Sequence, residues 1–175
     1  MYKYISYLWL SLAVLFLQIF FIDNINLGAS MALWIRPMLF PLIVLLLPME
    51  WKPIWVIIVA YIVGNIMDLS LGGEGLYVAT LLPMALIRPW IVYVTTRRSV
   101  EVGEQKQLLA RLNTRQLMLY IGTALLIHHT LFFLFEALSL SNLFSMVLTI
   151  ILTLMFSMLL GWFIIRIFVS KVLVQ

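Results

Sequence analysis

The residues of this chain that could do chemistry are few, and they lie inside or beside long apolar runs. They are Arg36, Asp68, Arg88, His128, His129 and Glu136. Side chains of these types serve in acid–base catalysis, metal binding or ion pairing. A charge near the middle of a membrane costs at least about 2.5–3.5 kcal/mol on insertion scales, so we expect each one to have a partner or a water-lined site.

The histidine pair His128–His129 is the strongest candidate for metal or acid–base chemistry. Neighbouring residues point about 100° apart on a helix, so these two side chains cannot easily ligate one metal ion. The sequence contains no HExxH or GxSxG motif and no paired acids within an apolar run. We therefore predict no catalytic, metal or cofactor site, and expect packing or an interhelical hydrogen bond. An intramembrane enzyme that uses both histidines and Glu136 is the alternative.

The segment "LGGEG" is rich in glycine but lacks the spacing and the lysine of a phosphate-binding loop. Gly72, Gly73 and Gly75 instead predict a turn, because glycine adopts positive φ and permits close backbone approach. Glu74 is expected to be solvated there.

Two Arg-Pro pairs, Arg36–Pro37 and Arg88–Pro89, interrupt apolar segments. Proline removes a backbone donor and disfavours helix at the preceding residue, so both pairs predict kinks. Arg88 is either a structural anchor or a charge that positions a partner. Arg36 and Asp68 are expected at similar depth, either as an ion pair between two helices or as two independently solvated residues.

The composition is that of an integral membrane protein. Of the 175 residues, 65% are hydrophobic and only 10% charged, and the mean hydropathy is +1.13; soluble domains have about 45–50% apolar and 25% charged residues. The absence of cysteine excludes disulfides and thiolate metal sites. The net charge of +4 is better explained by orientation in the lipid bilayer than by nucleic-acid binding.

Apolar runs and breakers predict an all-α fold in a single domain, 1–175, with six transmembrane helices. The predicted spans are 4–22, 31–47, 54–67, 76–94, 116–135 and 143–169. The third is short, so it is broken, buried or continued through "DLSLGG". Every basic residue except Arg36 and Arg88 then falls on one side, which places the N- and C-termini in the cytoplasm. The cytoplasmic connector 95–115 is predicted to contain an amphipathic helix that lies on the membrane, or to dock a cytoplasmic partner.

Three segments carry a resemblance to a known family: "RPMLFPLIVLLLP", "GNIMDLSLGGEGLYVAT" and "ALIRPW". Together they resemble the rod-shape-determining protein MreD, in its Bacteroidetes-like form, over most of residues 30–95. The matching pattern is Gly64 and Asp68 in one helix, the glycine turn, Gly75-Leu76-Tyr77 at the next helix, and Arg88–Pro89. Tyr77 stands where relatives often carry a histidine, and the C-terminal half matches only in hydropathy.

The resemblance implies a non-enzymatic, multi-pass component of the bacterial inner membrane without a cofactor. Such a protein binds the bitopic scaffold MreC and works with the MreB filament and with RodA and penicillin-binding protein 2 in peptidoglycan synthesis. MreD-like proteins are also similar in architecture to the substrate-binding S components of energy-coupling-factor transporters, which supplies the alternative function. For that alternative, Asn65, Asp68 and Arg36 are the clustered candidates for a ligand cavity.

Overall fold

The computed structural model describes residues 2–25, 34–49, 51–97, 112–137 and 142–168. Within these ranges the secondary structure is helical, with no β-strand, so the predicted all-α class is confirmed. The elements are α1 (Tyr2–Phe16), the π-helix η1 (Leu17–Ile22), α3 (Pro41–Leu45), α4 (Pro53–Leu71), α5 (Leu76–Thr96), α7 (Thr114–Ala137) and α8 (Leu143–Phe168).

Among the described residues, four helices are long and apolar enough to cross a membrane, namely α4, α5, α7 and α8, and Tyr7–Ile22 forms a shorter apolar helix. α4 has 19 residues, which correspond to about 28 Å at 1.5 Å per residue. This length is close to the ~30 Å hydrocarbon core of a bilayer. The helix therefore continues past the predicted span 54–67, through Asp68 to Leu71. The lengths and compositions of these helices identify a membrane protein.

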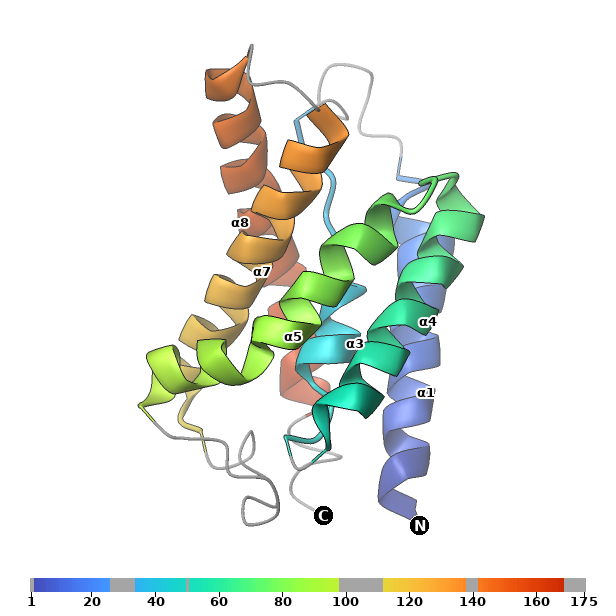
Figure 1. Ribbon diagram of the computed structural model, residues 1–175, viewed down its shortest axis with the longest axis vertical. Helices are drawn as coiled ribbons and strands as arrows, with labels where there is room; N and C mark the ends of the chain where they lie inside the picture. Colours follow the sequence, from blue (N-terminus) through green and yellow to red (C-terminus); the bar gives the residue numbers. More distant parts are fainter. Residues whose placement is uncertain (1, 26–33, 50, 98–111, 138–141, 169–175) are drawn as a thin grey trace.

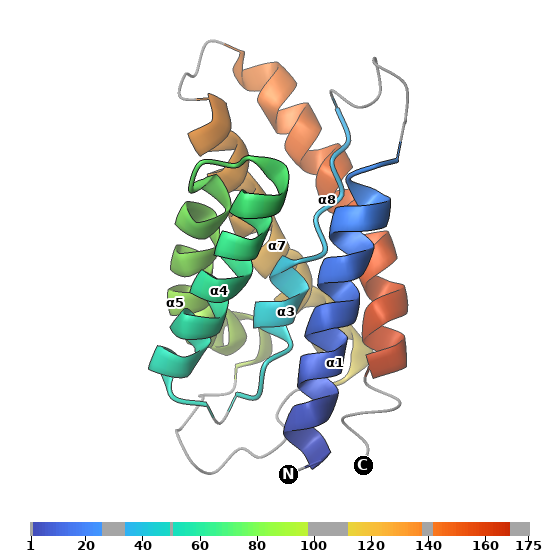
Figure 2. The same ribbon diagram turned by 90° about the vertical axis from the view of Figure 1, so that its right-hand side faces the viewer.

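The long helices run side by side along the long axis of the molecule (Figure 1). α1 begins and α8 ends at the same end, which we call the proximal end, and the turn between α4 and α5 lies at the opposite, distal end (Figures 1 and 2). α4 packs against α5, α5 against α7, and α7 against α8. The chain thus passes repeatedly between the same two ends.

The prediction of a transmembrane helix over 31–47 is wrong in the described part of that range. Residues 35–39 have no regular secondary structure and follow an extended path (Figure 2), and only Pro41–Leu45 are helical. Prolines explain the difference. Pro37 disfavours helix at Arg36, neither Pro37 nor Pro41 can donate a backbone hydrogen bond, and Pro41 suits the first turn of α3.

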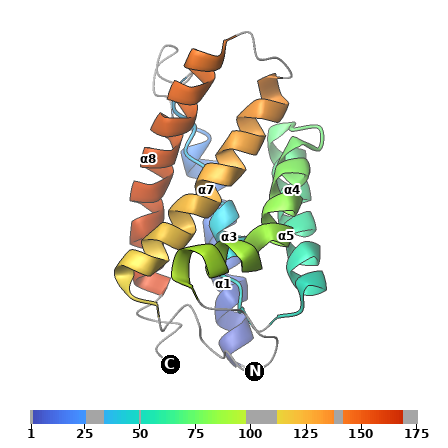
Figure 3. The same cartoon turned by 60° about the vertical axis from the view of Figure 1, so that its left-hand side comes forward.

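This extended segment and α3 form the centre of the molecule rather than its lipid-facing rim. Every residue from Met38 to Met49 is buried, and α3 contacts α1, α4, α5 and α7. Figure 3 shows α3 enclosed by the longer helices. A segment without regular backbone hydrogen bonds is tolerated at membrane depth only when protein or water surrounds it. Here the surrounding helices provide that enclosure.

α5 contains Pro83 and Pro89 and remains one helix from Leu76 to Thr96. Its ribbon changes direction toward the C-terminal end (Figures 1 and 3), as expected for a helix that lacks two of its backbone donors. Pro37, the other predicted kink, lies in the extended segment and therefore bends no helix. Most of the predicted connector 95–115 lies outside the described residues, so its amphipathic helix stays a prediction.

Candidate functional site

Within the described residues the extended segment pairs with no strand. The first turn of α3 bonds the carbonyl of Leu39, and side chains bond other backbone groups of the segment. Gln18 of η1 supplies two of these bonds and is 1% exposed. Its Oε1 accepts the backbone N–H of Leu39 at 2.6 Å, and its Nε2 donates to the carbonyl of Pro37 at 3.1 Å. The same Nε2 donates to Oδ2 of Asp23 at 3.0 Å. One buried amide thus holds the segment against the first helix.

Helix α8 holds the opposite side of the segment. Oγ1 of Thr153 accepts the N–H of Arg36 at 3.3 Å, and Oγ of Ser157 accepts the N–H of Met38 at 2.9 Å. The two hydroxyl residues are four positions apart, so they lie on one face of α8. Figure 2 shows the segment running between η1 and α8. It is therefore clamped from two helices that are distant in the sequence.

Arg88 caps the end of α3. Its side chain is 2% exposed; Nη2 donates to the carbonyls of Leu45, at 3.4 Å, and Leu47. Nε donates to the hydroxyl of Tyr120 at 3.2 Å, and that hydroxyl donates to the Leu45 carbonyl at 3.0 Å. A cation is favourable at a helix C-terminus, where carbonyls lack partners. This geometry is that of the structural anchor, one of the two roles that the sequence left open.

The histidines belong to a hydrogen-bonded chain through the core. His128 Nε2 lies 3.4 Å from Oγ1 of Thr80, the two Nδ1 atoms lie 3.4 Å apart, and His129 Nε2 lies 3.1 Å from Oγ of Ser157. Both side chains are fully buried. The chain links α5, α7 and α8 to the extended segment at Met38, so the expected interhelical hydrogen bond is present.

The donors in this chain can be assigned in one consistent direction. The Thr80 hydroxyl donates to the carbonyl of Tyr77 at 3.1 Å, so its oxygen is left to accept from His128 Nε2. A neutral imidazole has one donor and one acceptor, so His128 Nδ1 accepts from His129 Nδ1. Ser157 then donates to His129 Nε2 and accepts from the backbone. Two neutral histidines satisfy the entire chain, and among the described residues no group of three or more His, Cys, Asp or Glu is arranged to hold a metal ion.

At the distal end, Asp68 caps helix α5. Its Oδ1 accepts the N–H of Tyr77 and its Oδ2 accepts the N–H of Val78, each at 3.1 Å. A carboxylate at a helix N-terminus satisfies orphan donors and meets the positive end of the dipole. The glycines make this reach possible. Gly72 and Gly75 have φ of +69° and +93°, and a Cβ on Gly73 would collide with the Asp68 carboxylate and the ring of Tyr77.

Arg36 has a different partner from Asp68. Its Nη1 lies 2.5 Å from Oε1 of Glu136, the one ion pair found among the described residues. The guanidinium carbon also lies 5.9 Å from the ring centroid of Phe133. The two charged side chains are 44% and 34% exposed. The suggested Arg36–Asp68 pair is therefore wrong: the Arg36 guanidinium pairs with Glu136, and the Asp68 carboxylate accepts two backbone N–H groups of α5.

Four of the residues that hold the buried segment were not singled out from the sequence. They are Gln18, Tyr120, Thr153 and Ser157. Gln18 carried a usable signal, because a long polar amide inside a predicted span needs an internal partner. Serine, threonine and tyrosine are ordinary in membrane helices, so the other three carried none.

The three candidates for a ligand cavity each bond to a different partner. Asn65 donates to the carbonyl of Tyr61 in its own helix at 2.8 Å, Asp68 caps α5, and Arg36 pairs with Glu136. Comparison with protein-family models, curated proteins and solved structures finds no match for this chain.

Proposed function

We propose that this protein is an MreD-like, non-enzymatic component of the bacterial elongation machinery, which binds MreC in the inner membrane and helps to organise peptidoglycan synthesis. The observation that carries the proposal is that the residues of the resemblance form one structural unit. Asp68 caps α5, the glycine turn joins α4 to α5, and Arg88 fixes α3 between them. A sequence pattern that builds a fold supports common ancestry more strongly than scattered matches do.

Close packing of α4 against α5 adds to this support. A Cβ on Gly64 would lie 2.8 Å from Cα of Val78, so only glycine fits that contact. Gly64 is one of the residues that carry the resemblance. Residues of the resemblance therefore form the contact between α4 and α5, the turn that joins these helices, and the buried arginine of α5.

The proposed topology has six passages and cytoplasmic termini. The four long helices, the α1–η1 helix and the extended segment with α3 each run between the two ends of the molecule. The positive-inside rule supports a cytoplasmic proximal end, where Lys52, Arg97 and Arg115 flank the helices. The distal end carries the acidic residues Asp23, Asp68 and Glu136, together with Arg36.

The internal use of polar groups supports an assembly role. The buried amide, hydroxyl, imidazole and guanidinium groups described above bond to the protein itself, and large apolar side chains cover the outward faces of α1, α4 and α8. Such faces offer contacts to the membrane helices of partners such as MreC, RodA and penicillin-binding protein 2. MreB would be reached directly or through them.

Co-purification from the native membrane tests the proposal. The protein is tagged at its native level, extracted in mild detergent and analysed by mass spectrometry, with an unrelated tagged multi-pass protein as the control. We expect enrichment of a bitopic coiled-coil scaffold together with a cell-wall polymerase and a transpeptidase, and rounding of the cells on depletion. Enrichment of an ATPase pair with a transmembrane coupling subunit would overturn the proposal in favour of a vitamin-type transporter.

A further inference from the structure

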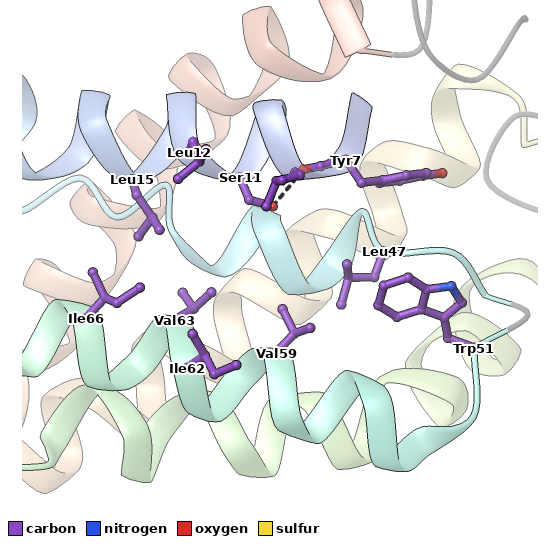
Figure 4. Close-up of a pocket in the computed structure, with 11 residues that line it drawn as sticks. Tyr7, Ser11, Leu12, Leu15, Leu47, Trp51, Val59, Ile62, Val63 and Ile66 are labelled. Atoms are coloured by element: carbon purple, nitrogen blue, oxygen red, sulfur yellow. Dashed lines mark hydrogen bonds between the residues drawn. The ribbon is translucent and has the colours of Figure 1, made fainter. Parts of the chain in front are cut away.

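A groove with a volume of about 330 Å³ separates α1 from α4 in the proximal part of the molecule. Figure 4 shows the side chains of the two helices facing each other across it. The lining includes Tyr7, Leu12 and Leu15 of α1, Ile62 and Ile66 of α4, and Trp51 just before α4. The hydroxyl of Ser11, also in the wall, donates to the carbonyl of Tyr7 at 2.8 Å. The wall therefore presents apolar surface and a hydroxyl that is already bonded.

The size of the groove distinguishes between the occupants that a membrane offers. A spanning helix about 10 Å across and about 30 Å long occupies about 2,400 Å³, so the groove cannot enclose one. A methylene group is about the size of a water molecule, whose share of liquid volume is about 30 Å³, so the groove accommodates roughly ten of them. About ten carbons of one acyl chain therefore fit in this space.

A basic residue follows the groove lining in the chain at the proximal end. Trp51 lies at that end beside Tyr7 (Figure 4), and the next residue, Lys52, is exposed. Tryptophan and tyrosine favour the level of the lipid headgroups, and a basic residue there attracts anionic lipid. The apolar walls complement an acyl chain, and the nearby lysine complements an anionic headgroup, so the groove matches both parts of a phospholipid.

We infer that the α1–α4 groove binds one anionic phospholipid, with an acyl chain between Leu12 and Ile62 and the headgroup phosphate beside Lys52. The lipid fills the space that separates α1 from α4 and so links the first helix to the rest of the bundle. The inference requires only a bilayer around these helices and does not depend on the proposed partners.

Crosslinking in lipid nanodiscs tests the site. The purified full chain is reconstituted with phosphatidylcholine and a small fraction of phosphatidylglycerol that carries a photoreactive group on one acyl chain. After illumination, crosslinked residues are mapped by mass spectrometry. We expect crosslinks concentrated at Leu12, Leu15, Ile62 and Ile66. Crosslinks spread evenly over the lipid-facing residues of α1, α4 and α8 would overturn the inference, because they would indicate ordinary surrounding lipid.

Filling the groove provides a matched comparison. Ile62→Trp places a large ring in the wall of the groove, whereas Ile58→Trp makes the same change on an exposed residue of the same helix outside the groove. Both positions are partly exposed, so both variants should fold. We expect crosslinking in the groove to fall to background in Ile62→Trp alone. Equal yields in the two variants would contradict the site.

Charge reversal tests the headgroup. Lys52→Glu should reduce the preference for phosphatidylglycerol over a photoreactive phosphatidylcholine by about fivefold or more, while Arg166→Glu at the end of α8 should leave it unchanged. An unchanged preference in Lys52→Glu would refute the headgroup assignment. If a protein co-purifying from native membranes crosslinks to the groove and excludes the lipid, the occupant is a partner and the inference fails.

Discussion

The dipeptide Arg-Pro occurs twice in this chain, and its two copies occupy opposite environments. Arg36 precedes Pro37 in an extended segment and reaches an exposed carboxylate, Glu136, near the distal end. Arg88 precedes Pro89 inside a long helix and is buried, where it donates to backbone carbonyls at the end of α3. The first arginine forms an ion pair between two exposed positions, whereas the second donates hydrogen bonds to buried backbone carbonyls.

The difference shows that burial, more than residue type, decides what an intramembrane charge contributes. An exposed ion pair is worth about 0–1 kcal/mol, because water screens the attraction and two long side chains lose freedom. A buried polar group that loses its partner costs about 1–3 kcal/mol. The free energy of unfolding should therefore fall clearly more in variants of the buried groups than in variants of the exposed ion pair.

The largest loss is expected for Arg88→Met. The Leu47 carbonyl would lose the Arg88 donor, and the Leu45 carbonyl would keep only the Tyr120 hydroxyl. We expect the free energy of unfolding to fall by about 3 kcal/mol, measured by denaturation with sodium dodecyl sulfate in mixed micelles. The control Arg36→Met should lose about 1 kcal/mol or less. Similar losses in the two variants would show that Arg88 does not anchor α3.

Gln18→Leu is expected to cause the next largest loss of stability, because it removes both side-chain bonds from Gln18 to the extended segment beside Arg36–Pro37. The N–H of Leu39 and the carbonyl of Pro37 would be left without this partner, at an expected cost of about 2 kcal/mol. The Leu39 amide should also exchange its hydrogen faster, as measured by mass spectrometry. Phe20→Leu, an exposed change in the same π-helical turn, should alter neither quantity. Unchanged exchange at Leu39 in Gln18→Leu would contradict the clamp.

Asp68→Ala tests the cap of the helix that carries Arg88. Loss of a capping side chain costs about 1–2 kcal/mol, and Asp68→Asn should cost less because its amide oxygen still accepts one N–H. Glu74→Gln, at an exposed position in the same turn, should stay within about 0.5 kcal/mol of the parent. The same denaturation assay measures all three. A neutral result for Asp68→Ala would exclude the capping role.

The smallest effect is expected for the exposed ion pair. A double-mutant cycle with Arg36→Met and Glu136→Gln should give a coupling energy of about 0.2–1 kcal/mol that declines with added salt. A parallel cycle of Arg36→Met with Asp68→Asn should give almost no coupling. Stronger coupling to Asp68 than to Glu136 would reverse the assignment of partners.

The helical class and most helix positions follow from local patterns. Long apolar runs predict α4, α5, α7 and α8, and the glycines before Leu76 predict a turn where Gly72 and Gly75 adopt positive φ. These features depend on residues close together in the chain, so a single sequence contains enough information for them.

The path of residues 34–47 could not be predicted in the same way. Hydropathy treats "RPMLFPLIVLLLP" as another span, because a buried extended segment is as apolar as a lipid-facing helix. The Arg36–Pro37 pair predicted a kink in that span, not a segment without helix. What permits an extended chain there is a set of acceptors and donors on η1, α5 and α8.

The sequence by itself determined that the chain is a membrane protein, where most of its helices lie and that its interior charges need partners. Tertiary structure alone decided which groups those partners are: backbone carbonyls at the end of α3 for Arg88, the amides of α5 for Asp68, and Glu136 for Arg36. The physical reason is that hydropathy is a property of each segment, whereas a hydrogen bond requires two groups about 3 Å apart. Folding brings those groups together from distant positions in the sequence, so their spacing along the chain does not predict which groups come within hydrogen-bond distance.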